Sequence, residues 1–111
     1  MDGLSPMAEK WLDVCALVDI PERGARRFDI AGLPVGVFRT RSGEIFAIEN
    51  RCPHMGGPLS EGIVHDSAVT CPLHNWVIDL RSGVARGADD GCVTTYPVEV
   101  RQGRVCLKIA I

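Results

Sequence analysis

Two short phrases of the sequence carry side chains that bind metals. Residues 52–57 read CPHMGG and residues 71–76 read CPLHNW, so each phrase opens with Cys-Pro and supplies one thiol and one imidazole. The resulting pattern is C-x-H, then sixteen residues, then C-x-x-H. Thiolates and imidazoles are the protein ligands of zinc and of some iron–sulfur clusters. The candidate metal ligands are therefore Cys52, His54, Cys71 and His74.

Three interpretations fit these four residues. In the first they are ordinary buried thiols and surface histidines, although two such pairs rarely arise together by accident. In the second they hold a tetrahedral structural zinc ion, whose sites more often take two cysteines from one loop and two histidines from another. In the third they hold a [2Fe–2S] cluster in which two histidines replace two cysteines on one iron. The third interpretation explains why each loop supplies one cysteine and one histidine. Cys52 and Cys71 would then bind one iron, and His54 and His74 the other.

The sequence around the two phrases predicts strands almost throughout. Short apolar runs separated by turn residues fill residues 26–50. Residues 62–70 predict two short strands, residues 76–87 a strand followed by a turn, and residues 93–111 a hairpin with Gln102-Gly103 at its tip. Turns about eight to twelve residues apart are typical of a small sandwich or barrel, so we expect an all-β fold whose strands position two metal-binding loops.

The length of 111 residues suits a single domain with a modest core. We expect residues 1–10 to be a flexible tail and residues 11–111 to form the domain, with the metal-binding loops near residues 50–59 and 71–78. Five cysteines is an odd number, which disfavours a framework made only of disulfides and favours a metal or redox role for some of them.

Charge and hydropathy argue against two classes of partner. The net charge of −2 comes with no basic stripe, so we expect no nucleic acid. The apolar runs are only a few residues long, so we expect no membrane span. The first residues lack the basic and apolar regions of a secretory signal, so we expect a cytoplasmic protein whose cysteines stay reduced.

The two phrases resemble the two cluster-binding boxes of the Rieske family, C-x-H and C-x-x-H. The resemblance implies an antiparallel β fold with a small cluster-bearing subdomain of two loops, and a Rieske-type [2Fe–2S] cluster. Within that family, three stretches are similar to the small subunits of NAD(P)H-dependent assimilatory nitrite reductases: RCPHMGGPLSEGIV, CPLHNWVIDLRSGVARG and GCVTTYPVEVRQGRV. This similarity runs over most of residues 11–108. The ligands that it implies are Cys52, His54, Cys71 and His74.

The resemblance implies an electron carrier rather than a complete enzyme, and the sequence shows no nucleophile–base pair or phosphate-binding loop. The implied partner is a large subunit with FAD, siroheme and an iron–sulfur cluster, which reduces nitrite to ammonium in nitrate assimilation. The alternative is a stand-alone Rieske ferredoxin, which passes electrons from a flavin reductase to the terminal oxygenase of an aromatic-ring dioxygenase. A third hypothesis, from the ligand chemistry alone, is a zinc-stabilised interaction module.

Several other residues near the boxes have an expected place. Met55, Leu59 and Leu73 are expected to form an apolar cover that limits solvent access to the cluster. His65 lies in neither box and is interpreted as a solvated turn residue, and Trp76 as a core or interface residue. The remaining cysteines lie in or beside apolar runs and are expected to behave as small buried hydrophobes: Cys15, Cys92 and Cys106.

Overall fold

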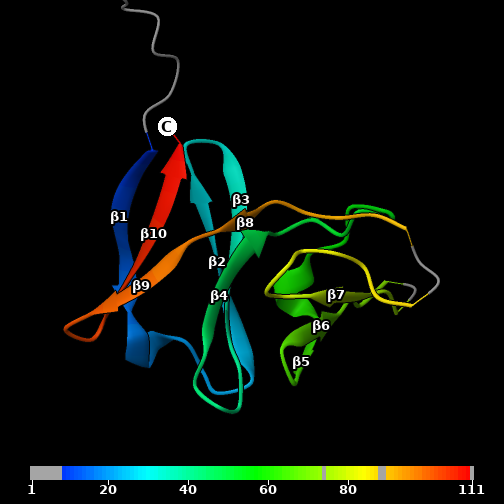
Figure 1. The fold of residues 1–111 in the computed structure, drawn as a ribbon, viewed down its shortest axis with the longest axis horizontal. Coiled ribbons are helices and arrows are strands. Elements are labelled where there is room, and N and C mark those ends of the chain that lie inside the picture. The colour runs from blue at the N-terminus through cyan, green and yellow to red at the C-terminus, as the bar shows by residue number, and fades with distance from the viewer. Residues whose placement is uncertain (1–8, 74, 88–89, 111) are drawn as a thin grey trace, which may run out of the picture.

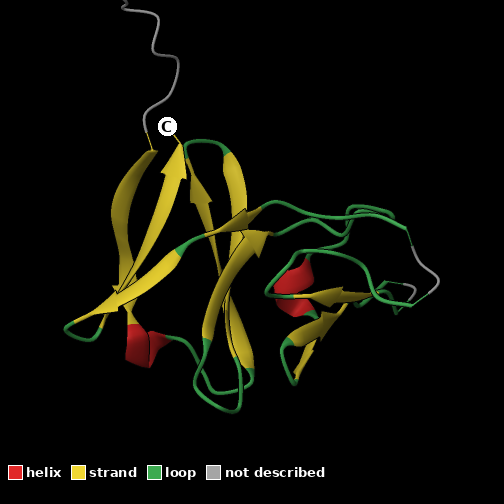
Figure 2. Ribbon diagram, viewed as in Figure 1, coloured by secondary structure: helices red, strands yellow, loops and turns green. Residues whose placement is uncertain are grey.

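The computed structural model describes residues 9–73, 75–87 and 90–110. Within these residues the chain forms ten strands and two single-turn 3₁₀ helices, η1 and η2, arranged in three antiparallel sheets (Figure 1, Figure 2). Two sheets make up a larger part, and the third lies to one side of it as a smaller part (Figure 1). The prediction of an antiparallel all-β fold is therefore confirmed. No helix in the described ranges is long and apolar enough to cross a membrane.

The first sheet has the strand order β1-β10-β9, and its strands are β1 (Glu9–Ala16), β9 (Val98–Arg101) and β10 (Arg104–Ala110). The turn between β9 and β10 lies at the predicted hairpin tip. Gln102 has φ 50° and Gly103 has φ 78°. Two consecutive positive φ values are typical of the tight turns whose twist matches that of antiparallel strands.

The second sheet has the strand order β2-β3-β4-β8. Its strands are β2 (Gly24–Ile30), β3 (Leu33–Arg39), β4 (Ile45–Glu49) and β8 (Thr95–Tyr96). Helix η1 (Leu17–Asp19) joins β1 to β2 across the two sheets.

Strand β8 corrects the expectation of one hairpin over residues 93–111. Thr95 pairs with Ile48 and Tyr96 with Ala47, so this stretch joins the second sheet before the chain crosses to the first. Pro97 has no N–H to donate to a sheet ladder, and it falls between the two strands.

The third sheet has the order β5-β6-β7 and belongs to the smaller part. Its strands are β5 (Ile63–His65), β6 (Ala68–Thr70) and β7 (Val77–Asp79), and helix η2 (Leu59–Glu61) precedes them. The expected pair of short strands within residues 62–70 is confirmed. The two metal-binding boxes lie at either end of this small hairpin in the sequence, one before η2 and the other between β6 and β7.

Strand β3, in the middle of the second sheet, is buried on both faces. Successive side chains of a strand point to opposite faces, and strand β3 shows the consequence. Val35 and Val37 pack in one core cluster with Val105 of strand β10. Phe38 packs in a separate cluster that contains Cys52 and residues of the smaller part. This middle sheet therefore joins the two parts into one body.

The chain start differs from the expected tail. Glu9 and Lys10 belong to strand β1, where they pair with Ala110 and Ile109 of strand β10. The rest of the expected tail, residues 1–8, lies outside the described residues. That residues 11–111 form one independent domain stays a prediction.

Asn50 links the two parts through its side chain. It is a buried polar residue at the end of strand β4. Its amide nitrogen donates to the Ser60 hydroxyl at 2.9 Å, and its amide oxygen accepts from the Ser60 N–H at 2.7 Å. The Asn50 N–H donates to the Pro34 carbonyl at 2.9 Å, so this residue holds helix η2 against the middle sheet.

Replacing Asn50 with Ala is expected to lower the free energy of unfolding by about 1–3 kcal/mol, because the Ser60 N–H then loses its acceptor in a part-buried site. Ser60→Ala removes only the hydroxyl and keeps the N–H bond, so its loss is expected to be smaller. Urea denaturation of both variants measures the two losses. Equal unfolding midpoints for Asn50→Ala and the unmodified chain would contradict the linking role.

Candidate metal centre

The structure brings two of the four predicted ligands together. Cys52 is 2% exposed and Cys71 is 1% exposed, and both belong to the same core cluster. The Cys52 thiol lies close enough to the Cys71 thiol to raise its pKa. His54 lies on the exposed part of the first box. His74 lies outside the described residues, so its place relative to the other three is a prediction from the spacing.

Each box is a short closed loop with its cysteine at the base. In the first box, the Cys52 N–H donates to the Gly57 carbonyl and the Gly56 N–H donates to the Cys52 carbonyl, both at 2.8 Å. In the second box, the Cys71 N–H donates to the Trp76 carbonyl at 2.7 Å. Closing each loop at its base fixes the direction of the thiol before any metal is bound.

The surroundings of Cys71 suit a thiolate that binds iron. The Leu73 N–H points to the Cys71 sulfur at 3.4 Å, and a donor of this kind stabilises negative charge on a metal-bound sulfur. Gly57 leaves room beside it, since a Cβ at that position would lie 3.1 Å from the Cys71 sulfur and 3.0 Å from the Leu73 side chain. The two buried sulfurs and their N–H donor therefore fit the thiolate side of an iron–sulfur cluster.

Burial raises the pKa of the Cys71 thiol, the Leu73 N–H lowers it, and contact with the Cys52 thiol raises it again, for a net increase. Without metal, the Cys71 thiol therefore holds its proton at neutral pH. Metal ligation needs the thiolate, so filling the site releases protons.

A third segment of the chain covers the first box from outside. Gly91 lies so close that a Cβ there would be 2.9 Å from the Pro53 Cβ and 3.5 Å from the Trp76 ring. The Trp76 indole in turn stacks on the His54 imidazole, with ring centroids 4.6 Å apart and an interplanar angle of 12°. Sequence reasoning placed Trp76 in a core or interface and missed this contact, although an aromatic residue two positions after a predicted histidine ligand was a usable signal.

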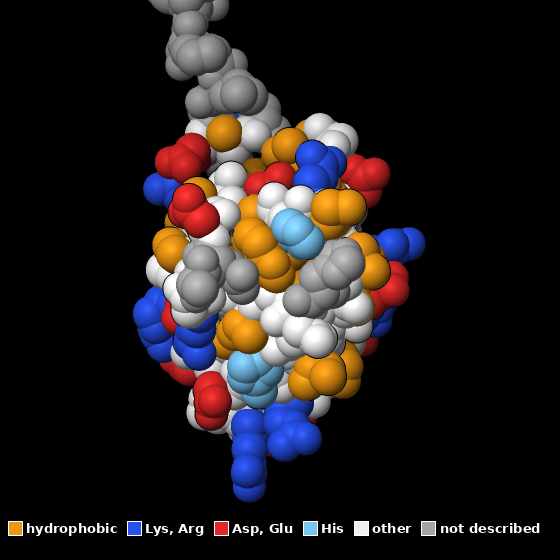
Figure 3. Space-filling model, turned by 90° about the vertical axis from the view of Figure 1, so that its right-hand side faces the viewer, with side chains coloured by type: hydrophobic (Ala, Val, Ile, Leu, Met, Phe, Trp, Pro, Cys, Tyr) orange, Lys and Arg blue, Asp and Glu red, His pale blue; other side chains and the backbone are white. Residues whose placement is uncertain are grey.

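The outer end of the smaller part is apolar in places (Figure 3). Met55 is 64% exposed and Leu73 is 44% exposed. Leu59, which was expected beside them, is instead fully buried in the core, because helix η2 turns it inward against the middle sheet. The expectation was wrong for Leu59, and that Met55 and Leu73 cover the cluster stays a prediction.

The remaining cysteines divide differently from the expectation. Cys15 and Cys106 are buried as predicted, but Cys92 is exposed. The prediction for Cys92 was wrong because the segment after Gly91 follows the surface and turns the next side chain, Val93, inward.

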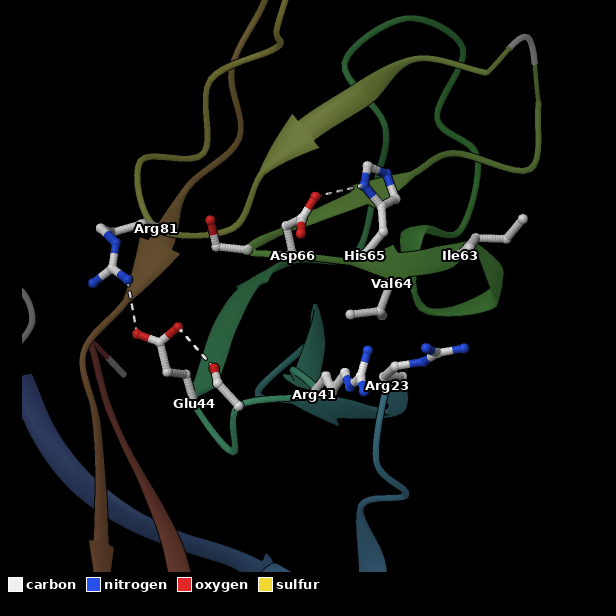
Figure 4. A pocket seen from close by; sticks show the side chains of 10 residues that line it. Arg23, Arg41, Glu44, Ile63, Val64, His65, Asp66 and Arg81 are labelled. Atoms are coloured by element: carbon white, nitrogen blue, oxygen red, sulfur yellow. Dashed lines mark hydrogen bonds and ion pairs between the residues drawn. The ribbon is translucent and has the colours of Figure 1, made fainter.

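An open groove lies between the two parts, away from the boxes (Figure 4). It has a volume of about 760 Å³, and none of the three predicted ligands that the structure describes, Cys52, His54 and Cys71, lines it. The Arg81 guanidinium and the Glu44 carboxylate bridge it as an exposed ion pair at 2.8 Å. His65 also lines it, and its Nε2 is hydrogen bonded to the Thr70 hydroxyl at 2.7 Å. His65 is thus a half-buried strand residue rather than a solvated turn residue.

Among the residues that the structure describes, no three His, Cys, Asp or Glu side chains gather closely enough to hold one metal ion. Comparison with known families decides the kind of centre. The sequence model of the Rieske [2Fe-2S] domain matches residues 10–97. The chain belongs to the Rieske [2Fe–2S] family. Its cofactor is accordingly a Rieske-type [2Fe–2S] cluster rather than zinc, and when bound this cluster carries one electron at a time.

Known Rieske proteins resemble the chain over nearly its whole length. It is 32% identical to the ferredoxin component of a naphthalene 1,2-dioxygenase system from Pseudomonas aeruginosa, over 94% of this chain and 100% of that protein. It is 39% identical to the ferredoxin subunit of a 3-phenylpropionate/cinnamic acid dioxygenase from Escherichia coli, over 86% of this chain and 90% of that protein.

A solved structure of a putative NADH-dependent nitrite reductase small subunit from Mycobacterium tuberculosis is also similar. Its TM-score is 0.84 at 25% identity, and the match covers 94% of this chain and 98% of that one. The chain is therefore a Rieske electron-transfer protein.

Proposed function

We propose that Cys52 and Cys71 bind one iron of the Rieske cluster and that His54 and His74 bind the other. The two buried, adjacent thiols support the first pair. The exposed position of His54 supports the second, and the C-x-x-H spacing adds His74. Under this assignment the imidazole side of the cluster faces solvent. The electron then enters and leaves on that side, beside Met55 and Leu73.

We further propose that the chain is the small subunit of an NAD(P)H-dependent nitrite reductase, which reduces nitrite to ammonium in the cytoplasm. The observation that carries this proposal is the end-to-end structural match to the putative nitrite reductase small subunit from Mycobacterium tuberculosis, with coverage above nine-tenths of both chains. The three stretches quoted from the sequence, which reach beyond the two boxes to residue 105, support it as well. The partner is then a large subunit that holds FAD, siroheme and its own iron–sulfur cluster.

A second candidate function is that of a stand-alone ferredoxin, which passes electrons from a flavin reductase to an aromatic-ring dioxygenase. The observation in its favour is sequence identity. The two dioxygenase ferredoxins are 32% and 39% identical to the chain, compared with 25% for the nitrite reductase small subunit. Both candidates use the same cluster and differ only in the partner.

The experiment that separates them uses the iron-loaded chain with two sets of purified partners from the same organism. One set is the siroheme subunit of nitrite reductase, and the other is a ferredoxin reductase with a ring-hydroxylating oxygenase. We expect the chain to co-elute with the siroheme subunit in size-exclusion chromatography and to increase NAD(P)H-dependent nitrite consumption. Absence of that complex, together with support of ring hydroxylation by the second set, would establish the ferredoxin role instead.

A further inference from the structure

Trp76 connects both cluster-binding boxes. Its main-chain carbonyl accepts the Cys71 N–H at 2.7 Å, which closes the second box. Its side chain stacks on His54 of the first box, nearly parallel and with a centroid separation of 4.6 Å. The indole is half-buried and packs against the core cluster that contains both Cys52 and Cys71. One residue therefore reaches the base of one box and the exposed imidazole of the other.

The segment around Gly91 holds this arrangement from outside. A Cβ at Gly91 would meet Pro53 at 2.9 Å and Trp76 at 3.5 Å, so only the bare backbone of glycine fits there without displacing Pro53. The Gly91 carbonyl accepts the Ala85 N–H at 2.9 Å, which ties the segment to the chain that leaves strand β7. The backbone at Gly91 therefore lies against both Pro53 of the first box and the Trp76 ring.

We propose that Trp76 is a positioning residue for His54. The second side-chain torsion of histidine has only a weak, roughly two-fold preference, so contacts with neighbours decide the plane of the ring. The indole face limits that rotation and presents the imidazole in one plane. It also keeps water from one face of the ring. This inference rests on the proposed role of His54 as a cluster ligand.

Two measurable consequences follow for the loaded protein. An imidazole that is already in its binding orientation should release iron more slowly. An aromatic pair of ordinary strength favours that orientation by about two- to tenfold. The indole also reduces the water around the cluster on the histidine side, and water favours the reduced form because that form is more negatively charged. Loss of the indole is therefore expected to speed iron release and to raise the reduction potential.

The test compares Trp76→Leu, which keeps apolar bulk without a ring, with Trp76→Phe, which keeps a smaller ring. In the cluster-free chain, proton NMR of the His54 ring should show an upfield ring-current shift that Trp76→Leu abolishes and Trp76→Phe retains in part. In the loaded chain, Trp76→Leu should release iron to a chelator about two- to tenfold faster, from the same pair strength, and should have a higher potential. The Phe variant should lie between Leu and the unmodified chain.

Trp11→Leu is the matched control, because that indole lies on strand β1 and contacts Arg101 rather than a box. It should leave the His54 shift, iron release and potential unchanged. Unchanged iron release and potential in a folded Trp76→Leu protein would overturn the proposal, as would an unchanged His54 shift. If Trp76→Leu does not fold, the same three measurements on Trp76→Phe test the proposal, and no change in any of them would overturn it. A cluster retained in full by His54→Ala would instead show that the ligand role had failed, whatever the ring-current shift in the cluster-free chain.

Discussion

Replacing Cys52 with Ser is expected to leave the purified chain colourless, with iron falling from about two atoms per chain to almost none. Thiolates are the strongest ligands in this set, and a serine hydroxyl stays protonated and binds iron poorly. Cys71→Ala is expected to have the same effect, because Cys52 alone cannot complete its side of the cluster. Cys15 and Cys106 cannot act as substitutes, since they are buried on strands β1 and β10 of the first sheet, away from the boxes.

Iron and acid-labile sulfide analysis measures this loss, and the EPR spectrum of the reduced protein checks the kind of cluster. His65→Ala is the matched control. Its imidazole is hydrogen bonded to Thr70 in the groove and belongs to neither box, so the visible spectrum should not change. A protein bleached by His65→Ala but not by His74→Ala would show that the ligand assignment is wrong.

The second large effect concerns the reduction potential, which we expect near about −150 mV, at the low end of the Rieske range, rather than near about +300 mV. Two ferric ions, two sulfides and two thiolates sum to zero charge when the imidazoles are neutral. Reduction is therefore easier than in a cluster held by four thiolates. Hydrogen bonds to the sulfurs set the place within the range, because donors stabilise the added electron.

In high-potential members of the family, a Ser lies two residues after the second histidine ligand and a Tyr two residues further on. Those positions hold Trp76 and Ile78 in this chain. The indole of Trp76 stacks on His54, and Ile78 is fully buried in the core with no hydroxyl to donate. The Leu73 N–H remains as a donor to the Cys71 sulfur, at 3.4 Å.

Direct voltammetry at pH 7 measures the potential. A low value also suits a carrier that receives electrons from a nicotinamide-linked flavin, which both candidate functions require. A value above about +100 mV, well into the upper part of the family range, would reveal a donor to the sulfurs that has been overlooked. It would also count against both electron-carrier roles.

The sequence predicted the local elements of this fold well. Alternation of apolar residues and clear turn residues identified the short strands within residues 26–50 and 62–70 and the hairpin tip at Gln102-Gly103. Such features depend on neighbours in the sequence. The cysteine pair was also predictable, because the Cys-Pro phrases sit between strands that bring their loops together.

Contacts between distant segments could not be predicted in this way. The local sequence at Thr95 and Tyr96 does not predict that these two residues pair with strand β4 rather than extend the hairpin that follows. Leu59 looks like a loop residue until helix η2 turns it into the core. The stacking of Trp76 on His54 depends on how the two boxes face each other, and Gly91, far along the chain, closes over both.

Strand β3 determines how the molecule can open. Val37 faces one core cluster and Phe38 the other, so no fluctuation frees this strand without breaking both. Its amide hydrogens should therefore exchange with solvent only when the whole chain unfolds. The boxes lie at one end of the smaller part (Figure 1), with their two cysteines in the same core cluster as Phe38 and with His54 and Met55 exposed. We therefore expect iron to enter and leave through the exposed side of the boxes without unfolding of strand β3, and we expect a chain stripped of its metal to accept a new cluster.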